Sequence, residues 1–180
     1  MSSPKNNFGG KIMAKKVSVY ALLTVICLGV SYIEGICFSF IAMPGLKLGL
    51  ANTIPMLLIK EKKYGASVLI NLTRILLSSL LFGNFYSLIF SLTGALLSTL
   101  TVFLLSRFKI FSFAGISSAA GTMHNLGQII AALLTIGTKG ILYLLPLLML
   151  CGSVMGFISG ILLNIFKTKY KKTADMLIKV

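Results

Sequence analysis

Long apolar runs separated by short polar and basic segments dominate this chain. A membrane-spanning helix needs about 20 mainly apolar residues. Six runs meet or approach that length, at roughly 17–36, 48–59, 64–82, 86–105, 112–137 and 141–165, and the second is short. The pattern therefore predicts an all-α polytopic membrane protein with six transmembrane helices.

The two ends of the chain differ from these runs. Residues 1–12 are polar and glycine-rich, which predicts a disordered N-terminus. Residues 167–180 form a basic tail, so the six-helix domain is expected over 13–166. Of the 180 residues, 57% are hydrophobic and 11% are charged, with a mean hydropathy of +0.97. A soluble domain cannot bury that much apolar surface, so composition and pattern agree.

The net charge of +14 is distributed like a topology signal, not like a nucleic-acid-binding stripe. With the N-terminus inside, only Lys47 and Lys139 lie in outer loops, and Arg74 lies within a helix. The remaining basic residues predict cytoplasmic termini in a bacterial cell membrane, with the lipid bilayer and not nucleic acid as partner. They are Lys5, Lys11, Lys15, Lys16, Lys60, Lys62, Lys63, Arg107, Lys109, Lys167, Lys169, Lys171, Lys172 and Lys179.

Small residues recur at four-residue spacing on three of the predicted helices. Such faces let helix backbones approach closely within a bilayer, so we expect them to pack helix against helix. A docking face for a partner is the alternative. The sets are Gly152, Gly156 and Gly160; Gly127 and Ala131; and Gly94 and Ser98.

Arg74 is a charged residue in the middle of a predicted span, where it costs about 2.5–3.5 kcal/mol on insertion scales. Asn71 and Ser78 lie three residues before it and four after it, so all three share one helix face. That face should point toward the bundle interior or a wet cavity. Two roles stay open for Arg74: it anchors a ligand, or it forms a fixed ion pair with Glu34.

A second polar cluster, His124, Asn125 and Gln128, lies on the fifth predicted helix, with Gly121 one turn earlier. An apolar helix has no reason to carry these side chains unless they meet polar partners. We expect them to bind the polar head of a ligand. Hydrogen bonds that hold neighbouring helices together are the alternative.

Several chemistries do not fit the residues of this chain. One histidine and no CxxCH exclude bis-histidine or c-type haem, and no nucleotide-binding glycine motif is present. The three acidic residues are too far apart in sequence to form a catalytic or Mg²⁺-binding carboxylate pair. Cys27, Cys37 and Cys151 lack CxxC spacing and are expected to act as small apolar residues. We therefore expect a binding protein or conduit, without a metal and without enzymatic activity of its own.

The segment AMPGLKLGLANTIP, residues 42–55, interrupts the apolar pattern. Pro44 and Gly45 predict a loop on the outer side, and Lys47 marks the start of the second helix. Irregular backbone at membrane depth is tolerated only where protein or water covers it. The loop is therefore expected to cover a cavity that opens outward, with Lys47 and Arg74 presenting positive charge to it.

Pro55 falls inside the second predicted helix and should bend it, because proline lacks the backbone N–H. Asn52 and Thr53 are candidates to satisfy the backbone groups that the bend frees. We expect Pro44, Gly45 and Pro55 to act as the loop and hinge of the site.

Three segments resemble one known family: PGLKLGLAN at 44–52, TRILLSSLLFG at 73–83 and HNLGQ at 124–128. They are similar to the Gx transporter family, also named heptaprenyl diphosphate synthase component I and grouped with the S components of energy-coupling-factor (ECF) transporters. The resemblance covers nearly all of residues 17–165. It implies an S-component-like bundle with a ligand site in its outer half, and an ECF coupling protein with ATPases as partners. The AxxxA-like coupling motif of S components is missing from the first helix.

The leading hypothesis is membrane binding and transport of an amphipathic small molecule, resembling a vitamin, a flavin or an isoprenoid. Lys47 and Arg74 would hold its anionic groups. The full set of predicted ligand-binding residues is Lys47, Asn52, Asn71, Arg74, His124, Asn125 and Gln128.

The resemblance also implies two alternatives. Relatives in flavin-based extracellular electron transfer suggest a bound quinone or flavin and an extracytoplasmic flavoprotein partner. The family's second name suggests component I of a heptaprenyl diphosphate synthase. Such synthases hold Mg²⁺–diphosphate with DDxxD motifs, and Asp175 is the only aspartate here, so the chain would be an accessory subunit at most.

Overall fold

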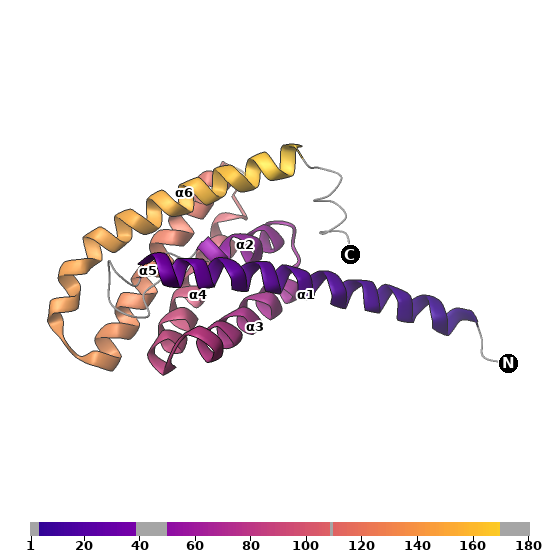
Figure 1. Cartoon of the computed structure of the whole chain (residues 1–180). Coiled ribbons are helices and arrows are strands. Elements are labelled where there is room, and N and C mark those ends of the chain that lie inside the picture. The colour runs from indigo at the N-terminus through magenta and orange to yellow at the C-terminus, as the bar shows by residue number, and fades with distance from the viewer. Residues whose placement is uncertain (1–3, 39–49, 109, 170–180) are drawn as a thin grey trace.

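The computed structural model describes residues 4–38, 50–108 and 110–169 of the chain. Within these residues every regular element is helical, which confirms the predicted all-α fold (Figure 1). The elements are α1 (Pro4–Phe38), η1 (Leu50–Asn52), α2 (Thr53–Lys60), α3 (Tyr64–Phe82), α4 (Phe85–Leu105), α5 (Phe113–Ile136), η2 (Lys139–Leu144) and α6 (Leu145–Lys169), where η denotes a 3₁₀ turn.

Five segments of the described chain are long and apolar enough to cross a membrane. This confirms a polytopic membrane protein. The second of the six predicted spans, however, is shorter than a full membrane crossing. The apolar helix Leu50–Lys60, made of η1 and α2, has 11 residues and is about 16 Å long at 1.5 Å per residue. It therefore covers only about half of a hydrocarbon core of about 30 Å.

Helix α1 begins at Pro4 and continues without a break into the span Met13–Cys37. The disorder predicted for residues 1–12 stays a prediction, since residues 1–3 lie outside the described part of the chain. Starting a helix is the costly step, and each added residue contributes its own hydrogen bond. The spanning helix therefore extends into the polar residues before it.

The ends of the central helices follow local sequence signals. The side chain of Asn84 accepts from the N–H of Ser87 at the start of α4, and Ser112 accepts from Gly115 at the start of α5. Gly137 ends α5 in the left-handed conformation, with φ of 72°. Pro146 lies in the first turn of α6, directly after η2, where a proline loses no helical hydrogen bond.

Helices α4, α5 and α6 pack closely through small residues. A Cβ atom added to Gly121 would lie 2.2 Å from the carbonyl oxygen of Gly152, and one on Gly156 would lie 2.3 Å from that of Ser117. A Cβ on Gly160 would lie 2.6 Å from the Cα of Ala114. Backbone therefore touches backbone along α5 and α6, the contact that the four-residue spacing predicts.

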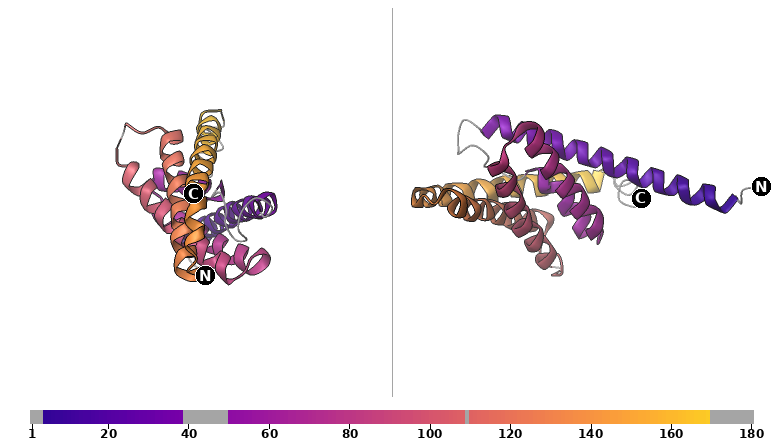
Figure 2. Two further views of the ribbon diagram at one scale, coloured as in Figure 1. Left: turned by 90° about the vertical axis from the view of Figure 1, so that its left-hand side faces the viewer. Right: turned by 90° about the horizontal axis from the view of Figure 1, so that it is seen from below.

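Helix α1 crosses the face formed by α2 and α3, and its N-terminal part runs past the rest of the bundle (Figures 1 and 2). Leu23 and Cys27 of α1 are buried against Leu58 of α2 and Ile70 of α3. The first turn of α1 and the last turn of α6 lie toward the same end of the molecule, and η2 lies at the other (Figure 1). This arrangement agrees with the positions of the basic residues along the chain.

Candidate functional site

Arg74 lies at the centre of the candidate site. It follows the first residue of α3, Tyr64, by ten positions, or about 15 Å of helix, which places it near the middle of a bilayer. Only 3% of its surface is exposed. A buried guanidinium must find hydrogen-bond partners, because an unpaired charge is costly away from water.

Three neutral side chains from three elements accept hydrogen bonds from Arg74. Its Nη1 donates to Ser31 Oγ of α1 at 2.9 Å. Its Nη2 donates to Asn52 Oδ1 of η1 at 2.7 Å and to Asn71 Oδ1, one turn earlier on α3, at 2.6 Å. Arg74 Nε is buried with no hydrogen-bond partner within the described chain. One strong donor at mid-membrane depth is therefore still unused.

Asn52 joins this cluster to the histidine of α5. Its Nδ2 lies 2.8 Å from His124 Nδ1. Because Arg74 can only donate, Asn52 must turn its oxygen toward Arg74 and its NH₂ group toward His124. His124 Nδ1 is then the acceptor in this contact.

Gln128 continues the network, with its Nε2 3.1 Å from His124 Nε2. The donor and acceptor in this contact depend on which ring nitrogen of His124 carries the proton. Gly94 of α4 makes room for this histidine, because a Cβ there would lie 2.8 Å from His124 Nδ1. A continuous buried path of hydrogen bonds thus runs from Arg74 through Asn52 and His124 to Gln128, which we call the Arg74 network.

Glu34 caps the broken helix from α1. Its carboxylate accepts from the backbone N–H of Leu50 at 2.8 Å and of Ala51 at 3.4 Å. These N–H groups belong to the first turn of η1, where no helical carbonyl can reach them. A carboxylate at a helix start also interacts favourably with the helix dipole. Glu34 is 2% exposed, so this cap lies inside the protein.

Within the described residues, Glu34 and Arg74 do not form the direct ion pair that was predicted. The ion pair found there within 4.0 Å joins Lys167 to Glu61. Glu34 still interacts electrostatically with Arg74, and η1 lies between them, bound to Glu34 by its backbone and to Arg74 by Asn52. The two charges therefore hold the same short segment from opposite sides.

The bend expected at Pro55 stays a prediction, and the structure places this proline near the start of α2. Pro55 lies in the first turn of α2, where the missing N–H removes no helical bond, and its carbonyl accepts from Ser67 Oγ at 2.7 Å. The interruption is the 3₁₀ turn before it. Thr53 Oγ1 donates to the Leu50 carbonyl there, whereas the Asn52 side chain does not cap α2.

The polar residues of α5 do not all face the same way. Asn125 Nδ2 donates to the Leu148 carbonyl of α6 at 2.6 Å, and its Oδ1 is buried without a partner in the described chain. A Cβ on Gly152 would lie 2.7 Å from this amide nitrogen. Asn125 thus contacts the α5–α6 packing face, while its neighbour His124 points toward α4 and η1. On α3, Ser78 donates to the Ile75 carbonyl instead of joining Arg74.

Three predicted site residues, Pro44, Gly45 and Lys47, lie outside the described residues. Ser31 is a contact that our sequence reasoning missed. Its signal was its position three residues before Glu34, which puts two polar side chains on one face of the first helix.

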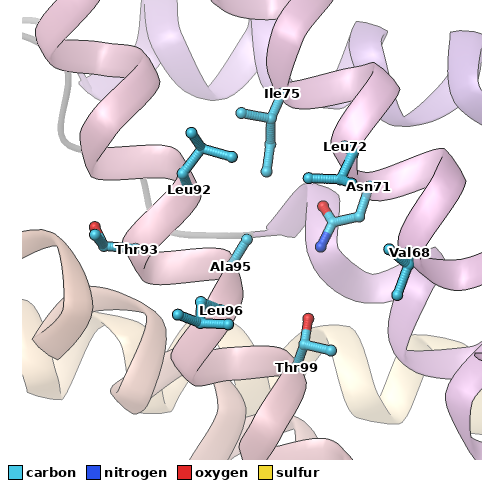
Figure 3. A pocket seen from close by; sticks show the side chains of 9 residues that line it. All are labelled: Val68, Asn71, Leu72, Ile75, Leu92, Thr93, Ala95, Leu96 and Thr99. Atoms are coloured by element: carbon cyan, nitrogen blue, oxygen red, sulfur yellow. The ribbon is translucent and has the colours of Figure 1, made fainter.

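A groove separates α3 from α4 beside the Arg74 network. It encloses about 330 Å³ and is lined mainly by aliphatic side chains, among them Val68, Leu72, Leu92 and Leu96 (Figure 3). Asn71, which binds Arg74 through its oxygen, also lines this groove. The groove therefore joins an apolar surface of the bundle to its buried charge.

These features define a polytopic helical membrane protein with a charged polar network at the middle of the bilayer. Among the described residues, no group of three His, Cys, Asp or Glu side chains could hold a metal ion. A family model for heptaprenyl diphosphate synthase component I matches residues 23–166, and the chain belongs to this family. No curated protein and no solved structure matches it.

Proposed function

We propose that this protein is a non-catalytic membrane component that binds a small amphipathic molecule within its bundle and moves it inward, in the manner of a transporter S component. The observation that supports this most is the buried Arg74 network around the broken helix η1–α2. Ionisable residues inside membrane bundles commonly mark substrate paths, and many transporters bind substrate at interrupted helices near the midplane.

The experiment combines ligand identification with an Arg74 variant. The mass of any small molecule that co-purifies with the full chain names the ligand, and uptake of that molecule is then measured in cells. Arg74→Gln removes the charge, and hydrogen bonds to charged groups contribute about 1.5–3 kcal/mol, so binding should weaken by about tenfold or more. Lys169→Gln removes a positive charge at the exposed end of α6 and should leave uptake unchanged.

Arg74→Lys keeps the charge without the planar fork, so it should retain part of the binding. Uptake by Arg74→Gln equal to that of the unaltered chain would remove the proposed role of this residue. If the co-purified molecule absorbs as a flavin or a quinone and Arg74→Gln leaves its uptake unchanged, the result favours the electron-transfer alternative instead.

The family description favours a second candidate, an accessory subunit of a heptaprenyl diphosphate synthase. The chain has one aspartate, Asp175, so a partner must supply the aspartate-rich diphosphate site. The protein would then hold the apolar product at the membrane. Co-purification with a soluble aspartate-rich prenyltransferase, and loss of its membrane association without this chain, would support this candidate. A prenyltransferase that never associates with the chain would contradict it.

A further inference from the structure

The groove between α3 and α4 contains three polar side chains in an otherwise apolar lining: Asn71 on α3, and Thr93 and Thr99 on α4. The Thr93 hydroxyl is already bound to the carbonyls of Ile89 and Phe90, so Asn71 and Thr99 are the two that can serve an occupant. Figure 3 shows the amide nitrogen of Asn71 and the hydroxyl of Thr99 pointing toward each other across the hollow. Polar atoms in an apolar membrane groove need a partner, so their chemistry indicates what the groove accepts.

The Asn71 amide can only donate into the groove. Its oxygen accepts the 2.6 Å bond from Arg74 Nη2, which leaves its NH₂ group for the hollow. The positive charge on the oxygen side polarises the amide and strengthens donation from the nitrogen side. Arg74 therefore acts through Asn71 to favour an acceptor in the groove.

Thr99 differs from the other threonines of α4. Thr93 and Thr101 donate their hydroxyl groups to carbonyls one turn earlier, those of Ile89 and Leu97, each at a distance near 3 Å. Within the described chain, Thr99 makes no such bond. Its hydroxyl hydrogen is therefore a second donor available to the groove.

The depth of the groove limits the charge of its occupant. Asn71 lies seven residues, or about 10 Å, along α3 from Tyr64, well inside the hydrocarbon region. A free anionic head group there would lose its hydration, whereas a carbonyl oxygen needs only one or two hydrogen bonds. Two donors, with no acidic or basic side chain in the lining, suit an uncharged acceptor.

A second hollow of about 250 Å³ continues the groove toward the inner end of the helices. The two hollows share Val68, Leu96 and Thr99, and the second ends at Tyr64 and Phe103, whose rings meet edge to face at 5.5 Å. Its lining beyond Thr99 is apolar apart from the Tyr64 hydroxyl. This part of the groove has the shape and chemistry for one apolar chain.

From these contacts we infer that the α3–α4 groove binds an uncharged, membrane-dissolved lipid whose head carries carbonyl oxygens and whose tail is a single apolar chain. The carbonyl oxygens accept from Asn71 Nδ2 and Thr99 Oγ1, and the tail lies toward Tyr64 and Phe103. The ligand enters sideways from the bilayer. This inference rests on the proposed function, because Asn71 belongs to the Arg74 network, and it names the class of molecule and its route.

This inference is tested by titrating the full chain, held in lipid nanodiscs, with decylubiquinone. This molecule has two ring carbonyls and one alkyl chain. Thr99→Val removes one neutral hydrogen bond and should weaken binding about three- to tenfold. Thr101→Val is the matched control, because its hydroxyl is bound within α4, and it should change nothing. Leu96→Trp places a bulky ring in both hollows and should abolish binding, whereas Leu80→Trp, at an 81% exposed position of α3, should not.

Decanol and decyl phosphate complete the experiment. Decanol carries the chain without carbonyl groups and should bind more weakly than decylubiquinone. Binding of decyl phosphate as tight as that of the quinone would overturn the uncharged head. Equal binding by the Thr99→Val and Thr101→Val variants, or by the two tryptophan variants, would overturn the site. Uptake that depends on Arg74 but not on Thr99 would leave the proposed function standing and refute this groove alone.

Discussion

At the scale of single residues, Asn52 is the side chain on which the site depends most. It bonds both Arg74 and His124, and it lies in the three-residue turn that Glu34 caps. Its amide has a donor and an acceptor end, and each end has one suitable partner. A leucine side chain has a similar volume but neither a hydrogen-bond donor nor an acceptor.

The first prediction therefore concerns Asn52→Leu. It leaves Arg74 Nη2 with one acceptor fewer and His124 Nδ1 without its donor, both buried. Unsatisfied buried groups cost about 1–3 kcal/mol each, so we expect a loss of roughly 2–4 kcal/mol in unfolding free energy. Thermal unfolding of the purified protein in detergent measures it. Asn164→Leu, at an exposed position of α6, should change little, and equal midpoints for the two variants would contradict the role of Asn52.

At the scale of elements, the bundle contains two kinds of helix contact. Helices α4, α5 and α6 touch through glycine and serine, so their backbones are close along the whole interface. Helices α3 and α4 meet over larger side chains and diverge enough to leave the groove. The close backbone contact thus joins α4 to α5 and α6, whereas the groove lies between α4 and α3.

Two glycine-to-alanine variants test the backbone contact between α5 and α6. Gly121→Ala adds a methyl group 2.2 Å from a backbone oxygen of α6, and overpacking of this kind costs about 1–3 kcal/mol. The Gly65→Ala Cβ would meet nothing within 4 Å, and alanine favours a helix over glycine by up to about 1 kcal/mol. Thermal midpoints should therefore fall for the first variant and stay level or rise for the second. The reverse order would show that α5 and α6 are not in backbone contact.

Sequence pattern predicted the long helices well and the broken one poorly. Tyr64–Phe82 and Phe85–Leu105 agree with prediction to within one residue, because glycine, asparagine and basic residues bound their apolar runs. Hydropathy alone could not show that the run at 48–59 contains a 3₁₀ turn at Leu50–Asn52, since the apolar content is the same either way. The carboxylate of Glu34, 16 positions before Leu50, helps to make that turn tolerable at depth.

The candidate site was predictable to the extent that it is local. Helix periodicity places Asn71 beside Arg74, and His124 beside Gln128. The bond between Asn52 and His124 joins residues 72 positions apart, and no local pattern carries that information. The role of Glu34 was also hidden, because its partners are backbone groups that every residue has.

At the scale of the whole molecule, basic side chains hold together the C-terminal ends of α2 and α6 and the N-terminal end of α5. Lys167 pairs with Glu61, and Lys60 Nζ lies 3.6 Å from the centre of the Phe113 ring. Burial and the positive charge of Lys167 lower the pKa of Lys60, an effect that Glu61 opposes. These basic side chains mark the end of the bundle that the charge pattern assigns to the cytoplasm.

Cysteine labelling tests this orientation. Cys37 is exposed at the outer end of the first span, whereas Cys27 is buried in the bundle. A membrane-impermeant maleimide should therefore label the protein on intact cells, and Cys37→Ser should remove most of that labelling. Labelling found only after the inner face is opened would reverse the assigned topology.

The cap that Glu34 places on η1 has a consequence for biogenesis. Helix α2 has eight residues, too few to partition into a bilayer alone or to stay helical in water. The 3₁₀ turn η1 that leads into α2 donates its first N–H groups to Glu34 of α1, and Asn52, the last residue of that turn, is held by Arg74 of α3. Although α2 leaves the ribosome before α3, we expect it to reach its final position only after α3 has inserted. The order of folding is then expected to differ from the order of synthesis.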